Sequence, residues 1–112
     1  MLKNNYIYIE HIQNCARKIL SYTKGMDEDA FLSNEIVQDA VIRNFEIIGE
    51  ASKQLSEDFK KEHEQSPWKE MAGMRDILIH DYIGTDLWAV WNTVTQYIPE
   101  LTEKLDNISK SD

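Results

Sequence analysis

Apolar side chains recur at spacings of three and four residues along almost the whole chain, which predicts helices nearly everywhere. The first helix is expected over residues 2–24. Its inward face would carry Tyr8, Ile12, Cys15, Ile19 and Tyr22. Gly25 is a suitable cap for the end of this helix, and Asp27 is a suitable N-cap for a short helical turn through Leu32.

Three longer helices are expected in the rest of the chain, with N-caps at Asn34, Ser66 and Asp86. The first runs to about Glu62, and its wide apolar face predicts packing on two sides. The second has Pro67 as its first helical residue and ends near Gly84. The third has apolar residues seven apart and is kinked by Pro99. We therefore expect an all-α fold, an antiparallel bundle of four main helices with one additional short helix, in a single domain over residues 1–112.

Composition narrows the class of protein. The chain has 12 basic and 20 acidic side chains and a net charge of -8, which argues against a broad basic surface that coats nucleic acid but permits a local phosphate site. The lone Cys15 cannot form an internal disulfide, so a packed, inert thiol in a reducing compartment is expected. No secretory signal is visible, and no apolar run approaches the roughly 20 residues that span a bilayer. A cytoplasmic protein without a membrane segment is therefore expected.

The segment 74–82, MRDILIHDY, groups an arginine, a histidine and a tyrosine near the end of an expected helix, in a chain with only three arginines and three histidines. The planar cation of Arg75 matches the geometry of a phosphate. The imidazole of His80 exchanges protons near neutral pH. These two groups are the minimum needed to cleave RNA without a metal, because one moves protons while the other holds the charged phosphorus centre.

Helix geometry tests whether these residues can meet. At ~100° per residue, Arg75 and Tyr82 would lie within about 20° of each other on the helix surface. Asp76 and His80 are four residues apart, so the carboxylate can orient the imidazole. Arg75 and His80 would differ by about 140°, so a single helix does not place them side by side. A twofold-related partner would bring two copies of each into one groove.

A purely structural interpretation is also open. An arginine and a histidine near a helix C-terminus often only complement the helix dipole and pair with acids, here Asp76 or Asp81. A metal site is disfavoured because the histidines, His11, His63 and His80, are scattered. Asp76 with His80 would offer only two ligands. No metal and no cofactor are therefore expected.

The pattern Arg-x4-His-x-Tyr resembles the signature of HEPN-domain ribonucleases, specifically the HepT-like toxins that pair with minimal nucleotidyltransferase antitoxins. The resemblance extends over nearly the whole chain. Residues 40–51 are similar to the second-helix block of that family, residues 67–75 to the approach to its active-site helix, and Trp91 with residues 99–101 to its last helix. The family commonly has asparagine after the arginine. Asp76 keeps a hydrogen-bonding side chain there but adds a negative charge beside the phosphate site.

The resemblance implies a HEPN-like fold and a homodimeric, metal-independent endoribonuclease toxin, with two Arg75/His80 pairs lining one interfacial cleft. It implies that a nucleotidyltransferase antitoxin transfers AMP from ATP to Tyr82, and that the added groups block the RNA site. Two other interpretations stay open. The chain could be a catalytically inactive helical module that binds a nucleotidyltransferase subunit, or a domain that binds a nucleotide in the same cleft without cleaving RNA.

Overall fold

The computed structural model describes residues 4–73 and 86–111, and every regular element within these ranges is a helix. The helices are α1 (Asn5–Thr23), α2 (Glu28–Leu32), α3 (Glu35–Lys53), α4 (Glu57–Glu62), α6 (Leu87–Gln96) and α7 (Ile98–Ser111). Residues 68–73 are also helical. The expected all-α, HEPN-like fold is therefore confirmed. The helix expected over residues 66–84 is described only as far as residue 73, so its predicted end near Gly84 lies outside the described residues.

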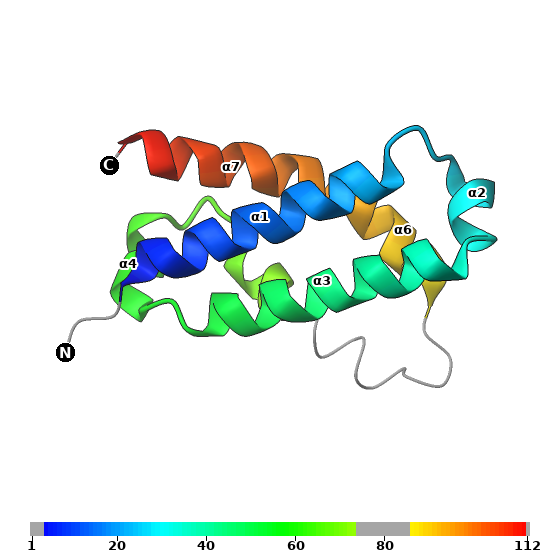
Figure 1. Cartoon of the computed structure of the whole chain (residues 1–112). Helices are drawn as coiled ribbons and strands as arrows, with labels where there is room; N and C mark the ends of the chain where they lie inside the picture. Colours follow the sequence, from blue (N-terminus) through cyan, green and yellow to red (C-terminus); the bar gives the residue numbers. More distant parts are fainter. Residues whose placement is uncertain (1–3, 74–85, 112) are drawn as a thin grey trace.

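The bundle is organised around α1, which packs along α3 on one side and along α7 on the other (Figure 1). α1 runs antiparallel to both of these helices (Figure 1). α2 lies at one end of the bundle, where it contacts α3 and α6, and α4 lies at the opposite end (Figure 1). None of the helices within the described ranges is long and apolar enough to cross a membrane.

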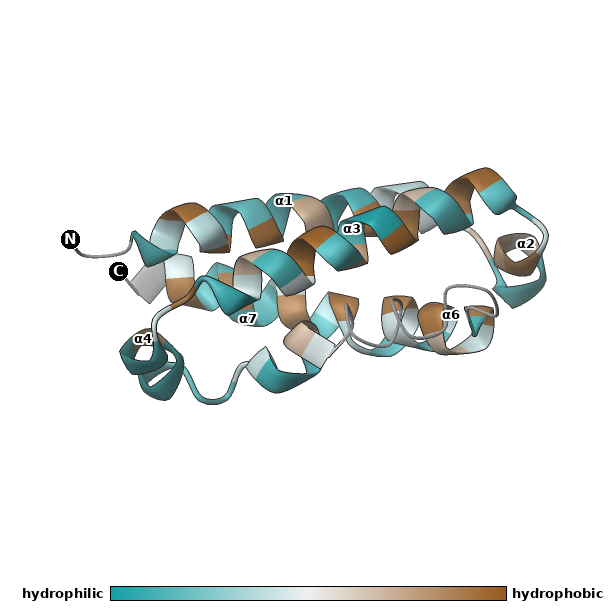
Figure 2. Ribbon diagram, turned by 90° about the horizontal axis from the view of Figure 1, so that it is seen from below, coloured by the Kyte–Doolittle hydropathy of each residue, from teal (hydrophilic) through white to brown (hydrophobic). Residues whose placement is uncertain are grey.

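Hydrophobic and hydrophilic residues alternate around each long helix, as amphipathic packing requires (Figure 2). The apolar faces merge into one cluster of buried side chains. Its largest fully buried members are Phe31, Phe45, Ile9, Ile12, Ile19, Ile48, Leu55, Met71, Ile98, Leu101, Leu105 and Val41. The expectation that Tyr22 belongs to the inward face of the first helix is wrong, because this side chain is 42% exposed. The buried Thr23 continues that face instead, and its hydroxyl donates to the Ile19 carbonyl at 2.8 Å.

Side-chain caps fix the starts of three helices where the sequence predicts them. Asp27 accepts from the Ala30 N–H at 2.8 Å, Asn34 from the Val37 N–H at 3.1 Å, and Asp86 from the Trp88 and Ala89 N–H groups at 3.1 and 3.2 Å. Gly25 follows the C-cap of α1 with a φ of 77°, in the left-handed region that favours glycine.

The helix that was predicted to begin at Pro67 begins one residue later. The carbonyl of Pro67, not that of Ser66, accepts the first helical bond, from the Met71 N–H at 3.0 Å. Pro67 therefore precedes the helix that begins at residue 68. Proline suits this position because a missing N–H costs nothing where no helical partner exists.

The single helix expected from Asn34 to Glu62 is wrong, because it is divided into α3 and α4. The N–H groups of Gln54 and Leu55 bond to carbonyls three residues earlier, which tightens and ends α3. Ser56 then caps α4 by accepting from the Phe59 N–H at 3.2 Å. Asn5 at the start of α1 fixes the break, since its side chain donates to the Ser56 hydroxyl at 3.3 Å and accepts from the Ser56 N–H at 3.0 Å.

The last helix is also divided, at Tyr97, where the sequence predicts only a kink. The Tyr97 N–H still bonds to the Thr93 carbonyl at 2.9 Å, and the Leu101 N–H bonds to the Tyr97 carbonyl at 2.8 Å. Between them Pro99 has no N–H to offer the Thr95 carbonyl, so the ladder is interrupted there. The apolar seven-residue repeat nevertheless stays in the core on both sides of the break, through Val94, Ile98, Leu101, Leu105 and Ile108.

Candidate active site

The four residues predicted to form the site, Arg75, Asp76, His80 and Tyr82, lie outside the described residues. Their mutual geometry therefore stays a prediction. The structure does describe the two segments that flank them in sequence. One is the turn and helical segment of residues 63–73, and the other is the start of α6 at residue 86.

The segment before the motif is anchored on α4 by aromatic side chains. The indole N–H of Trp68 donates to the His63 carbonyl at 2.9 Å, which closes the turn between α4 and residue 68. The Phe59 ring lies 6.3 Å from the Trp68 ring and 4.6 Å from the His63 ring, measured between centroids. Met71 is fully buried in the core. The chain thus leaves this anchored segment two residues before Arg75.

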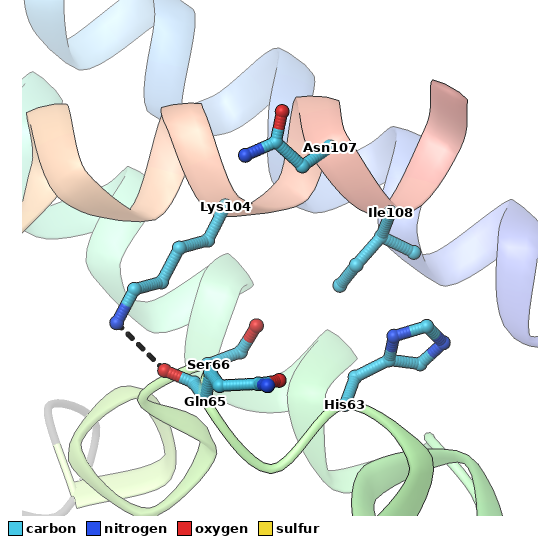
Figure 3. A pocket seen from close by; sticks show the side chains of 6 residues that line it. All are labelled: His63, Gln65, Ser66, Lys104, Asn107 and Ile108. Carbon is cyan, nitrogen blue, oxygen red and sulfur yellow. Dashed lines mark hydrogen bonds between the residues drawn. The ribbon is translucent and has the colours of Figure 1, made fainter. Parts of the chain in front are cut away.

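A lysine of α7 ties the same turn to the bundle from the other side (Figure 3). The Lys104 ammonium group donates to the Gln65 carbonyl at 2.6 Å, the bond drawn as a dashed line, and it lies 2.7 Å from the Glu100 carboxylate. A hollow of about 410 Å³ opens between this turn and α7. It is lined by His63, Gln65, Ser66, Lys104, Asn107 and Ile108. Because Glu100 already neutralises Lys104, this hollow is a poor phosphate site.

The segment after the motif is fixed by the cap and by a stacked aromatic pair. Asp86 caps α6, as described above, and Val90 is buried one turn later. Trp91 stacks on Phe31 of α2, with ring centroids 5.1 Å apart and planes 29° apart. The helix that follows the motif is therefore held by α2, which sequence periodicity alone did not indicate.

The described residues offer little other chemistry. Within the ranges that the structure covers, no group of three or more histidine, cysteine or acidic side chains is placed to hold a metal ion. The thiol of Cys15 is buried, as expected. Burial raises the pKa of this thiol, an effect that Lys18 and Arg43 oppose through their positive charges. A raised pKa disfavours the reactive thiolate, so Cys15 is a packing residue.

Comparison with known proteins adds evidence from the whole sequence. The ribonuclease HepT-like family matches residues 12–108, a range that includes all four predicted site residues. A protein of Methanocaldococcus jannaschii, named as a gamma-glutamylcyclotransferase and putative RNase, is 47% identical over 105 residues, which are 94% of this chain and 47% of that protein. The chain therefore spans about half the length of this relative. No solved structure gives a significant match.

Two further relatives match over most of their own length. A putative RNase of Caldanaerobacter subterraneus subsp. tengcongensis is 40% identical over 101 residues, 90% of either chain. A probable ribonuclease HepT of Thermococcus cleftensis is 43% identical over 110 residues, which are 98% of this chain and 100% of that protein. With the family match and the all-helical bundle, these likenesses give one conclusion: the chain belongs to the HepT-like ribonuclease family.

Proposed function

We propose that this protein is a metal-independent endoribonuclease, the toxin of a toxin–antitoxin pair, and that it acts on RNA in the cytoplasm. The observation that carries the proposal is the position of the Arg75/His80/Tyr82 motif inside the family match over residues 12–108. An arginine and a histidine together supply charge stabilisation and proton transfer, which are the two requirements of RNA cleavage by the ribose itself.

The proposed reaction uses two histidines and one phosphate. His80 of one protomer removes the proton from a ribose 2′-hydroxyl, and the 2′-oxygen attacks the adjacent phosphorus. The bond from phosphorus to the 5′-oxygen breaks, and a second His80 donates a proton to that leaving oxygen. Arg75 stabilises the extra negative charge of the pentacoordinate transition state. The products carry a 2′,3′-cyclic phosphate and a 5′-hydroxyl.

We propose that a homodimer supplies the two histidines that this reaction needs. On a helix, Arg75 and His80 are separated by about 140° around the axis, so one protomer does not align them by itself. A twofold axis would place both pairs in one cleft and supply the second histidine. The side chain of Asp76, four residues before His80, is proposed to orient the imidazole.

Regulation is proposed to act at Tyr82. A nucleotidyltransferase antitoxin would transfer AMP from ATP to its phenol oxygen, releasing pyrophosphate. Each AMP brings a negative charge and a purine to the same side of the helix as Arg75. The guanidinium would bind the added phosphate, and the purine would exclude RNA.

The test compares Arg75→Ala and His80→Ala with the parent in cleavage of a single-stranded RNA in EDTA. Both variants are expected to lose cleavage while circular dichroism and dimerisation stay unchanged. Arg43→Ala and His11→Ala are matched controls, because each removes an exposed residue of the same type from a helix of the described bundle. These controls should cleave like the parent.

Three outcomes would contradict parts of the proposal. Cleavage by Arg75→Ala and His80→Ala at the parental rate would mean that the site is elsewhere. Cleavage by the parent that disappears in EDTA would refute the metal-free mechanism. A parent that cleaves no RNA but binds a nucleotidyltransferase would favour the inactive interaction module, which the net charge of -8 also fits.

A further inference from the structure

A second hollow lies on the turn that leads toward the motif, on the side formed by α4 and the helical segment 68–73. Its volume is about 320 Å³. It is lined by Lys60, Lys61, Glu64, Ser66, Trp68, Lys69 and Glu70. Three of the 12 basic side chains of the chain thus meet around one small hollow, in a protein whose net charge is -8.

Two of these lysines have their charge available for a ligand. Lys60 is half-buried, and its ammonium group lies 3.6 Å from the Glu57 carboxylate, which partly neutralises its charge. Lys61 and Lys69 are exposed, and neither makes an ion pair with any residue within the described ranges. Exposed ammonium groups of this kind bind phosphates as point charges.

The two lysines belong to different elements, but the structure holds these elements in a fixed relation. Lys61 is on α4, and Lys69 is on the helical segment 68–73. The turn between them is closed by the bond from Trp68 to the His63 carbonyl and by the bond from Lys104 to the Gln65 carbonyl. A binding site built across this turn therefore needs little reorganisation when a ligand arrives.

We infer that this lysine hollow binds a backbone phosphate of the RNA substrate, next to the phosphate that is cleaved. The inference rests on the proposed function, which assigns cleavage to a site that contains Arg75. Lys69 precedes Arg75 by six residues in the sequence. It also explains how a chain with a net charge of -8 holds an RNA strand: attraction is confined to a local cluster of cations.

The carboxylates that line the same hollow give the inference a second testable consequence. Glu64 and Glu70 are exposed and line the hollow beside the lysines, so they repel the phosphate that the lysines attract. Removing the lysine charges should weaken RNA binding, whereas removing the glutamate charges should strengthen it. Charge changes anywhere on the surface have these signs, so the size of the effect relative to the same charge change far from the hollow decides whether the site lies here.

The experiment measures binding of a fluorescein-labelled 2′-O-methyl RNA of about twelve nucleotides, a length within the usual footprint of single-strand binding proteins. This RNA lacks the attacking 2′-hydroxyl, so binding is measured without cleavage. The double variant Lys61→Ala/Lys69→Ala should raise Kd roughly tenfold, since each exposed charge pair contributes roughly two- to fivefold. Its log Kd should also depend less steeply on log salt, by about 0.7 per lost phosphate contact.

The matched control is Lys18→Ala/Lys24→Ala. It removes the same number of charges from exposed positions on the second half of α1 and at its C-cap, toward the α2 end of the bundle and away from α4 (Figure 1). This control should change Kd less than twofold, with roughly the salt slope of the parent. Glu64→Gln/Glu70→Gln should lower Kd by roughly two- to fivefold.

Cleavage assays separate this inference from the proposed function. A dinucleotide has one phosphodiester and cannot reach the cleavage site and the hollow together, so Lys61→Ala/Lys69→Ala should cleave it like the parent. The same variant should lose kcat/KM on the longer RNA. If Arg75→Ala is inactive but the lysine variant binds and cleaves long RNA like the parent, the lysine hollow does not bind RNA. If that variant keeps its RNA affinity but no longer captures the nucleotidyltransferase, the hollow binds the protein partner, and the inference is overturned.

Discussion

Trp68 is the residue that fixes the approach to the motif, so its replacement tests the connection between fold and site. Its side chain is 8% exposed, contacts the Phe59 ring, and donates to the His63 carbonyl. Truncating a buried tryptophan to alanine costs about 3–5 kcal/mol. Loss of the indole hydrogen bond adds about 1 kcal/mol. Trp68→Ala should therefore lower the free energy of unfolding by about 4–6 kcal/mol, against a total of roughly 6–17 kcal/mol for a chain of 112 residues.

A conservative variant separates the two contributions. Trp68→Phe keeps most of the apolar ring but removes the N–H donor, so we expect a loss of only about 1–2 kcal/mol. The measurement is urea-induced unfolding followed by circular dichroism, because the helical signal does not depend on which tryptophans remain. Trp88→Ala is the matched control, since that side chain is 60% exposed and its removal should cost no more than about 1 kcal/mol.

The prediction for Trp68 fails under two results. A cost below about 1 kcal/mol for Trp68→Ala would mean that residues 68–73 are not packed on α4 in solution. A cost for Trp88→Ala equal to that for Trp68→Ala would mean that burial does not decide the effect. Either result would also remove the fixed turn on which the lysine hollow depends.

Three further predictions concern assembly, regulation and the thiol. Light scattering at micromolar concentration should give twice the 13.1 kDa monomer mass, and a monomer mass throughout would exclude a shared cleft. Coexpression with the nucleotidyltransferase should add whole AMP units to the parent but none to Tyr82→Phe, which should keep nuclease activity; unchanged additions on the variant would place the modification elsewhere. Because burial raises the pKa of Cys15, its stabilising effect should be present below the ordinary thiol pKa and lost as the pH rises through the folded value. The free energy of unfolding of the parent should therefore fall more steeply in alkali than that of Cys15→Ala, and equal slopes would contradict the burial argument.

Local signals in the sequence were sufficient to predict the helices and several of their ends. The caps at Asp27, Asn34 and Asp86 depend only on a side chain and an N–H two or three residues later, so sequence spacing contains them. Breaks that depend on distant residues were not predictable. The break after α3 is held by hydrogen bonds between Ser56 and Asn5, which are 51 residues apart. The apolar spacing continues through the buried Leu55 and Phe59, so the sequence pattern gives no sign of this break.

In the candidate site, too, the sequence indicated individual residues but not the tertiary contacts around them. Residue chemistry and family resemblance suggested Arg75, His80 and Tyr82, which lie outside the described residues and stay predictions. The anchoring contacts around the motif had no sequence signal, because the Trp68 indole bond and the Phe31–Trp91 stack are tertiary. The lysine hollow was missed for a related reason: the global charge of -8 hides a local cluster that only packing brings together.

The packing of α7 along α1 has a consequence for synthesis of the protein. Side chains of α7, among them Leu101 and Leu105, fill the core beside the first helix. A nascent chain made only as far as α6 therefore leaves one side of α1 without its apolar cover, and the bundle cannot close. Folding requires contacts between segments made early and late, which delays it relative to a chain that folds through neighbours alone. For a ribonuclease, this order keeps the bundle incomplete until the segment that forms α7 has been translated.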